Sequence, residues 1–149
     1  MTVKLQSEPF DPGALTNAFL GAPGGAGAVV TFTGLVRSTP DDPILSLTLE
    51  HYPALAQRQL EDLRAKAITR FGLLAAAILH RYGTLYPGEP IVQVMTLAAH
   101  RSAAFDGASF IMDTLKTTAP FWKKEERPDG TSWVDAKHSD DAAAARWST

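Results

Sequence analysis

The stretch from His100 to Glu125 limits the fold more than any other part of this sequence, because it combines a helix, a break and a charged cluster. Its apolar residues recur at steps of four, three and four, which aligns them on one side of a helix that ends near Lys116: Ala104, Ala108, Ile111 and Leu115. Pro120 ends the helical pattern, and aromatic and basic side chains follow it. The stretch therefore predicts a helix that packs on a core and has cationic groups at both ends, a suitable frame for an anionic ligand.

The rest of the chain contains segments with strand and helix patterns. Apolar runs and alternations rich in β-branched residues predict strands at 28–36, 44–50, 73–82 and 91–98. Helical spacing predicts helices near 12–20 and at 54–71, the second of which Gly72 ends. The remaining expectations are an edge strand within 1–10, a turn region at 83–89, a short strand at 132–136 and a polar tail. The order predicts an α+β fold, with one mixed, mainly antiparallel sheet covered by two main helices in an α/β hammerhead-like arrangement.

The composition fits a single domain over residues 1–149, because 45% hydrophobic and 20% charged residues can build both a core and a solvated surface. The formal net charge of −2 argues against general binding to nucleic acid or to acidic membranes. The sequence has neither a membrane-spanning apolar run nor a signal-peptide pattern, so we expect a cytoplasmic protein. Cysteine is absent, which excludes disulfides, thiolate metal sites and a thiol nucleophile in this chain. The four histidines lack metal-ligand spacing, so we expect neither a metal nor another cofactor.

Three basic residues are candidates for binding an anion. His100 and Arg101 stand at the start of the helix, where free backbone N–H groups and the helix dipole favour negative charge. Arg37 follows a strand that contains a glycine, and its guanidinium suits phosphate or carboxylate. For all three residues, the alternative is an ordinary exposed charge.

Lys116 and Lys123 are the candidates for chemistry. Pro120 turns the chain between them, so the sequence spacing leaves open whether their ammonium groups converge or diverge. Phe121 and Trp122 could exclude water from a neighbouring lysine and move its pKa toward the range useful in proton transfer. The alternatives are solvated lysines beside aromatic residues that only anchor the core.

Two further patterns have simpler interpretations. The glycine-rich segment 21–27 lacks the ending of a phosphate loop and the spacing of a dinucleotide fingerprint, so we interpret it as a flexible turn. Glu50, His51 and Tyr52 form a polar group at a strand end. Successive side chains of a strand point to opposite faces, so we interpret this group as structural.

Six strings of the sequence, taken together, resemble one family. They are FTGLVR at 32–37, LTLEHYP at 47–53, HRYGTLYPGE at 80–89, AHRSAAF at 99–105, FIMDTLKTTAPFWKKE at 110–125 and WVDAK at 133–137. In this order and with few gaps, over residues 26–147, the chain is similar to the large, catalytic subunit of molybdopterin synthase. The strings LEHYP and APFWKKE are the ones most specific to that family.

The resemblance implies a sulfurtransferase of molybdenum-cofactor biosynthesis. Members of the family convert cyclic pyranopterin monophosphate to molybdopterin. They take the sulfur from the thiocarboxylated C-terminus of a small ubiquitin-like subunit that ends in Gly-Gly. The large subunits form a homodimer within a heterotetramer, and each active site takes residues from both of them. The absence of cysteine agrees with this chemistry, because the sulfur arrives on the partner's tail.

The resemblance also implies roles for individual residues. The catalytic candidates are Lys116 and Lys123, which would hold the partner's C-terminus or bond to it transiently and assist proton transfer. The substrate-binding candidates are Arg37, His100, Arg101, Lys124, Glu125 and Lys137. The candidates for lining the path of the glycine tail are Phe32, Met112, Pro120 and Phe121. Lys137 stands where the family frequently has arginine, so it keeps the charge but loses bidentate geometry.

The alternative function is that of a non-catalytic homologue, which binds a ubiquitin-like tail or a phosphorylated small molecule. The presence of both Lys116 and Lys123 favours the enzyme, because a binding module could lose either lysine. Formation of a dithiolene from the thiocarboxylated partner and the pterin precursor distinguishes the two functions.

Overall fold

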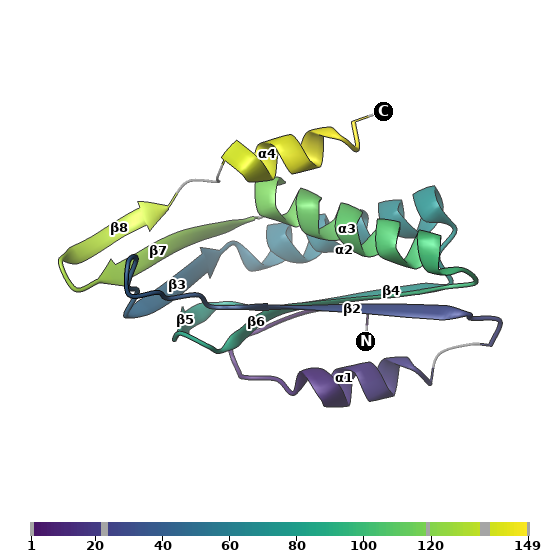
Figure 1. Ribbon diagram of the computed structural model, residues 1–149, viewed down its shortest axis with the longest axis horizontal. Coiled ribbons are helices and arrows are strands. Elements are labelled where there is room, and N and C mark those ends of the chain that lie inside the picture. Colours follow the sequence, from purple (N-terminus) through teal and green to yellow (C-terminus); the bar gives the residue numbers. More distant parts are fainter. Residues whose placement is uncertain (1, 22–23, 119, 135–137, 149) are drawn as a thin grey trace.

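The first of two sheets forms the centre of the molecule, with four strands in the order β1-β4-β6-β2 (Figure 1). These strands are β1 (Val3–Gln6), β4 (Ala75–Arg81), β6 (Pro90–Ala98) and β2 (Ala28–Leu35). β1 runs parallel to β4, and the other neighbouring pairs are antiparallel. The computed structural model describes residues 2–21, 24–118, 120–134 and 138–148.

The second sheet is antiparallel, with the strand order β5-β3-β7-β8. Its strands are β5 (Gly83–Leu85), β3 (Ser46–His51), β7 (Phe121–Arg127) and β8 (Gly130–Val134). Tyr82 alone separates β4 of the first sheet from β5 of the second. The two sheets therefore meet at the end of β4.

Helices cover both faces of the first sheet. Figure 1 shows α2 (Pro53–Phe71) and α3 (Arg101–Thr118) on one face, α1 (Pro12–Phe19) on the other, and α4 (His138–Ala145) outside α3. α1 begins where the Asp11 side chain accepts backbone hydrogen bonds, and α2 ends where Gly72 adopts a φ of 65°. None of the helices in the described part of the chain combines the length and the hydropathy that a membrane span requires.

The main core lies between the first sheet and the pair α2 and α3. The four apolar positions predicted to lie along one side of α3 are all buried: Ala104, Ala108, Ile111 and Leu115. Thr96 of β6 ties the helix to the sheet, because its hydroxyl donates to the carbonyl oxygen of Ala104 at 2.7 Å. A smaller cluster of Val36, Leu49 and Leu85 forms the core under the second sheet.

The α+β class and the mixed, mainly antiparallel pairing are confirmed, but the strands form two sheets where the sequence predicts one. β5 lies inside the predicted turn region. β7 is hidden in the sequence because charged residues occupy both of its faces and mask the alternation. α4 lies in the predicted polar tail, where consecutive alanines favour a helix by propensity without forming an apolar stripe.

The carboxylate of Asp113 on α3 binds the C-terminal segment through hydrogen bonds. Oδ2 of Asp113 accepts hydrogen bonds from Nη2 of Arg146 and from Nε1 of Trp147, each at 2.7 Å. The indole ring packs edge-on against Phe71 and Phe110, with ring centroids 5.5 and 5.8 Å away. The last residues of the chain thus pack on the same side of α3 as the end of α2.

We expect Asp113→Ala to lower the free energy of unfolding by about 1–3 kcal/mol, because the half-buried indole N–H and the guanidinium lose their shared acceptor. Thermal unfolding followed by circular dichroism measures this change. Asp106→Ala is the control, since it removes an exposed carboxylate from the same helix and should change stability by less than about 0.5 kcal/mol. Equal stability of the two variants would contradict the fastening role of Asp113.

Candidate active site

A column of four rings lies where the two sheets meet. His80, near the end of β4, stacks on Phe121, the first residue of β7, with ring centroids 4.2 Å apart and ring planes at 17°. Phe121 lies 5.7 Å from the ring of His51 at the end of β3, and His51 lies 4.4 Å from the ring of Tyr82. This ring column joins the first sheet to both central strands of the second.

The side chains of β7 divide between two faces. Lys123 lies on the face of Phe121, because side chains alternate along a strand, whereas Lys124 lies on the opposite face. Lys123 is paired in register with Leu49 of β3, which is buried. Lys124 instead has its Nζ 5.6 Å from the centre of the Trp133 ring. These adjacent lysines therefore have different surroundings.

The charges of both candidate lysines act on His80. The pKa of His80 is lowered to about 4, chiefly by burial and further by the positive charges of Lys123 and Lys116. Lys123 lies on the face of Phe121, whose ring stacks on His80, and α3 ends at Thr118, only a few residues before β7 begins. Lys116 is exposed and Lys123 is half-buried. We call this place the lysine site.

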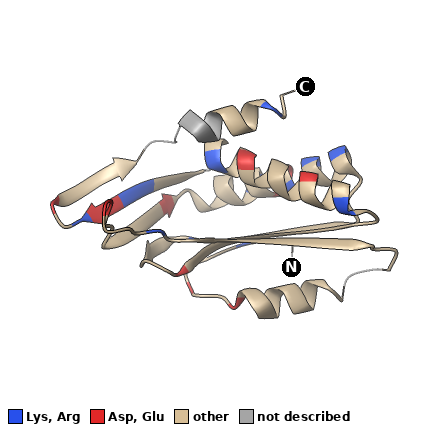
Figure 2. Cartoon of the chain, in the orientation of Figure 1, with Lys and Arg blue, Asp and Glu red and all other residues tan. Residues whose placement is uncertain are grey.

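His100 and Arg101 lie at the other end of α3. Figure 2 shows basic residues at both ends of this helix. A rise of about 1.5 Å per residue separates Arg101 from Lys116 by about 22 Å along the axis. Both residues are exposed. One chain therefore does not bring these anion-binding candidates to its own lysine site.

The other substrate-binding candidates have varied surroundings. Arg37 is exposed, two residues beyond the end of β2. Glu125 shares a face of β7 with Lys123 and forms an ion pair with Arg127. Lys137 lies outside the described residues.

Three of the four tail-path candidates lie next to the lysine site. Met112 precedes Lys116 by four residues on α3, so both lie on one side of the helix, and Met112 is half-buried against the main core. Pro120 and Phe121 lead into β7 and are half-buried. Phe32 lies in the first sheet, on β2, with 41% of its surface exposed.

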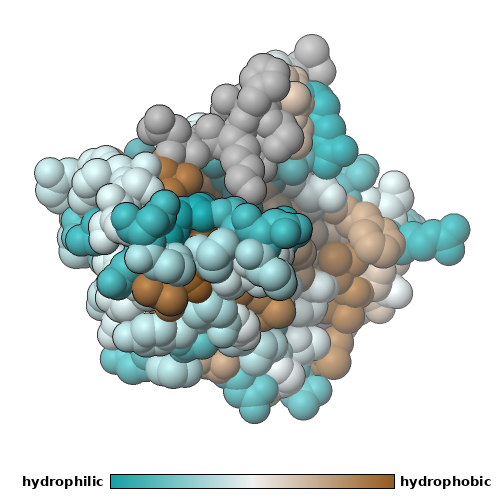
Figure 3. All heavy atoms as spheres, turned by 60° about the vertical axis from the view of Figure 1, so that its left-hand side comes forward, coloured by the Kyte–Doolittle hydropathy of each residue, from teal (hydrophilic) through white to brown (hydrophobic). Residues whose placement is uncertain are grey.

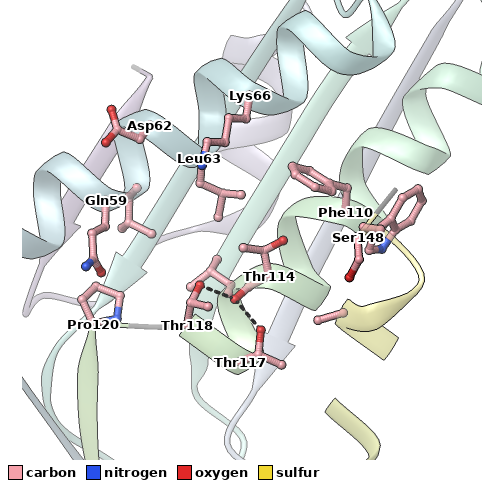
Figure 4. A pocket seen from close by; sticks show the side chains of 14 residues that line it. Gln59, Asp62, Leu63, Lys66, Phe110, Thr114, Thr117, Thr118, Pro120 and Ser148 are labelled. Carbon is pink, nitrogen blue, oxygen red and sulfur yellow. Dashed lines mark hydrogen bonds between the residues drawn. The ribbon is translucent and has the colours of Figure 1, made fainter. Parts of the chain in front are cut away.

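A pocket of about 480 Å³ lies beside the lysine site, between α2, α3 and the C-terminal segment (Figure 4). Its walls include the apolar side chains of Leu63 and Phe110, and Pro120 also lines it. Neither Lys116 nor Lys123 is among the described residues that line it. The pocket shares Pro120 with the tail path but does not contain the two amines.

The outer face of the second sheet carries exposed aromatic side chains. Tyr52 and Trp122 meet edge to face with ring centroids 5.1 Å apart, and Trp133 lies on the neighbouring strand. All three rings are at least half exposed. Figure 3 views this end of the molecule, where other, strongly hydrophobic residues also reach the surface among hydrophilic neighbours; tyrosine and tryptophan are pale on its scale. Exposed aromatic residues gathered on one surface are typical of a contact with another protein chain.

Two histidines of the site were not predicted from the sequence. His80 stands in a buried strand and within one of the family strings, and an ionisable ring in an apolar strand is the signal that could have identified it. His51 is interpreted from the sequence as structural, and in the structure it lies against Phe121 in the ring column.

Comparisons with known proteins agree on one family. A family model described as "MoaE protein" matches residues 5–118. A molybdopterin synthase catalytic subunit of Rhizobium meliloti (strain 1021) is 50% identical, over 99% of this chain and 96% of the relative. The solved structure of the molybdopterin biosynthesis MoaE protein from Burkholderia ambifaria MC40-6 is 44% identical, with a TM-score of 0.84 over 99% of this chain and 98% of that one. A chain in a protein-protein complex of subunits 1 and 2 of molybdopterin-converting factor from Helicobacter pylori 26695 shares the fold, with a TM-score of 0.72 at 22% identity over 91% and 90% of the two chains.

Proposed function

The chain belongs to the MoaE protein family, and we propose that it is the catalytic subunit of a molybdopterin synthase. In this role it converts cyclic pyranopterin monophosphate to molybdopterin in the cytoplasm. A small ubiquitin-like subunit supplies the sulfur from its thiocarboxylated C-terminus. The observation that carries the proposal is the 50% identity to such a catalytic subunit over 99% of this chain, in which Lys116 and Lys123 are both present.

Lys116 and Lys123 supply the chemistry as a pair of amines at the C-terminal carbonyl of the sulfur carrier. An ammonium group stabilises the negative charge that develops on the carbonyl oxygen when the thiocarboxylate is attacked. Once the sulfur is bonded to the pterin, an amine that has lost its proton can also attack the carbonyl carbon. The bond between that carbon and the sulfur then breaks, the sulfur stays on the pterin, and water hydrolyses the new amide to free the lysine and the carrier's carboxylate.

The glycine tail of the carrier reaches the lysines along Met112, Pro120 and Phe121, with Phe32 at the side of the first sheet. Two glycines have no side chains, so a narrow apolar path admits them and excludes bulkier residues. The three residues nearest the lysines are half-buried, so part of each side chain is accessible to a bound tail.

The phosphate of the substrate is held by His100 and Arg101 of a second copy of this chain, together with Arg37. Along α3, Arg101 lies about 22 Å from Lys116 of the same chain, which is too far for one small substrate to span. A homodimer that sets the start of one α3 against the end of the other forms a complete site. Glu125 remains a candidate on the face of Lys123, and Lys124 on the opposite face is left out of the proposed site.

Mixing of variants tests this composite site. We expect homodimers of Lys116→Ala, and homodimers of a His100→Ala, Arg101→Ala double variant, to be almost inactive at substrate concentrations below saturation. Random mixing of the two makes half of the dimers heterodimers, and each of these has one intact site. Activity should therefore return to about a quarter of the wild-type value. The measurement is product formation after the subunits have exchanged.

A second mixture is the matched control. Lys116→Ala mixed with Lys123→Ala should stay inactive, because each lysine pair comes from one chain and every site in the heterodimer lacks one amine. Recovery in this control, or none in the first mixture, would contradict a site built from the two ends of α3.

The function itself is tested by incubation of the protein with a thiocarboxylated carrier and cyclic pyranopterin monophosphate. The expected result is formation of the dithiolene, which mass spectrometry of the pterin product detects. A stable complex that forms no product would favour the alternative, a homologue that binds the tail without catalysis. A carrier with a carboxylate in place of the thiocarboxylate is the control for sulfur transfer.

A further inference from the structure

Arg81, the last residue of β4, is a buried charge outside the proposed site. Its side chain is 5% exposed, and Nη1 donates to Oε2 of Glu89 at 3.0 Å. Nε and Nη2 both donate to the carbonyl oxygen of Ser7, at 3.2 and 2.8 Å. A buried ion pair adds little stability compared with apolar side chains of similar volume, so its presence calls for another role.

Glu89 connects this arginine to the turn at 86–89. Its Oε1 accepts the backbone N–H of Tyr86 at 2.8 Å, and its own N–H donates to the carbonyl oxygen of Tyr86 at 3.1 Å. The hydrogen bonds from Arg81 and then from Tyr86 lower the pKa of Glu89, so the group is a carboxylate at physiological pH. The buried arginine and the turn are thus joined through one side chain.

The turn holds the backbone of Val36 on both sides. The N–H of Val36 donates to the carbonyl oxygen of Glu89 at 3.0 Å, and its carbonyl oxygen accepts from the N–H of Gly88 at 2.8 Å. Gly88 has a φ of 87°, a conformation that suits a residue without a side chain. Arg37 is the next residue, so the turn fixes the backbone from which its side chain starts.

The side chain of Val36 places this backbone beside the lysine site. Val36 and Leu49 belong to the small core under the second sheet, and Phe121 packs against the same core. Leu49 is the register partner of Lys123. Arg37 itself is exposed, so its guanidinium is accessible to a ligand while its backbone is held at the junction of the two sheets.

We propose that Arg81 and Glu89 are positioning residues of the phosphate-binding site: their ion pair holds the turn at 86–89, and the turn holds Arg37 in place for the substrate. The inference rests on the proposed function, in which Arg37 binds the phosphate. Ordering a backbone costs conformational entropy, so an arginine whose backbone is fixed before the substrate arrives binds it more tightly.

Two variants of Glu89 test the ion pair. Glu89→Ala removes both acceptor oxygens, whereas Glu89→Gln keeps one for the N–H of Tyr86 but has no charge for Arg81. We expect Glu89→Ala to raise KM for cyclic pyranopterin monophosphate by about threefold to 10-fold, with kcat within about twofold of wild type. Glu89→Gln should cause a smaller rise in KM.

Arg64→Ala is the matched control. It removes an arginine of α2 whose Nε donates to the carbonyl oxygen of Ala76 at 2.6 Å, far along the chain from the turn. We expect this variant to lower the thermal midpoint of unfolding without a change in KM. A rise in KM as large as that of Glu89→Ala would show that reduced stability alone explains the effect, which would overturn the inference.

A double-mutant cycle shows whether Glu89 acts through Arg37. Arg37→Ala alone should raise KM by about 10-fold to 100-fold, because it removes a hydrogen-bonded charge from the phosphate. In that background, Glu89→Ala should raise KM by less than about 1.5-fold further, since the group that it positions is gone. Effects that multiply would mean that Glu89 acts by another route, and the inference would be wrong.

Amide hydrogen exchange gives a readout that does not depend on turnover. The N–H groups of Val36 and Gly88 should exchange at least about fivefold faster in Glu89→Ala than in wild type, and at an unchanged rate in Arg37→Ala. Unchanged exchange in Glu89→Ala would overturn the inference and leave the proposed function intact. Wild-type protein that binds the precursor but forms no product would overturn the proposed function, and dissociation constants of the precursor then take the place of KM in the cycle.

Discussion

Lys116→Ala is expected to lower kcat by about 10²-fold to 10⁴-fold, while the dissociation constant of the thiocarboxylated carrier changes little. The lysine is exposed at the last turn of α3, so its side chain makes only a small part of a contact between two proteins. Its amine, by contrast, takes part in the reaction. Single-turnover formation of the dithiolene measures the chemical step, and titration calorimetry measures carrier binding.

Two further variants make the result specific. Lys116→Arg keeps the positive charge but has no nucleophilic amine, so recovery of rate by arginine would assign the lysine an electrostatic role, and no recovery would assign it a covalent one. Lys4→Ala removes an exposed lysine from β1 and controls for the loss of one charge. A Lys116→Ala variant that turns over at the wild-type rate would remove this residue from the mechanism.

The adjacent lysines of β7 should differ sharply in effect. We expect Lys123→Ala to lower kcat by about 10²-fold or more, because its side chain lies on the face of Phe121, near His80. Lys124→Ala should change kcat by less than about threefold, because Lys124 lies on the opposite face over Trp133. Steady-state kinetics of the two variants under identical conditions make the comparison.

The pair is its own control, since the variants lose the same side chain one residue apart in the same strand. Circular dichroism spectra of both should match the wild type. Equal losses of kcat would mean that turnover depends on the positive charge of β7 and not on the face of the strand from which each lysine projects. A larger loss for Lys124→Ala would contradict the proposed site directly.

Much of the fold follows from local patterns in the sequence. The helix at 54–71 and the apolar side of α3 are predicted because their buried faces contain only apolar residues, which leaves the helical period visible. Gly72 ends α2 as expected, because its left-handed conformation suits a residue without a side chain. The division into two sheets is not visible, because it depends on β7 and β5, whose patterns are masked or too short.

The sequence predicted the site only where residues close together in the chain determine the geometry. A proline between Lys116 and Lys123 indicates a turn, but the direction of that turn depends on the stack between Phe121 and His80, which lies 41 residues earlier. His80 was missed for the same reason, since its importance comes from side chains on three other elements. His100 and Arg101 are correctly expected at the start of α3. No sequence pattern shows whether they complete a site with the lysines of their own chain or with those of a second copy.

The alternation of side chains along β7 has a genetic consequence. Loss of a single codon within Phe121–Lys124 would exchange the faces of all side chains on one side of the deletion, unless the strand bulged to absorb it. The inward lysine and the ring that stacks on His80 cannot then both keep their places. In a mutational scan of this chain, in-frame deletions here should be as harmful as the worst substitutions, and a compensating insertion nearby in the same strand should restore function.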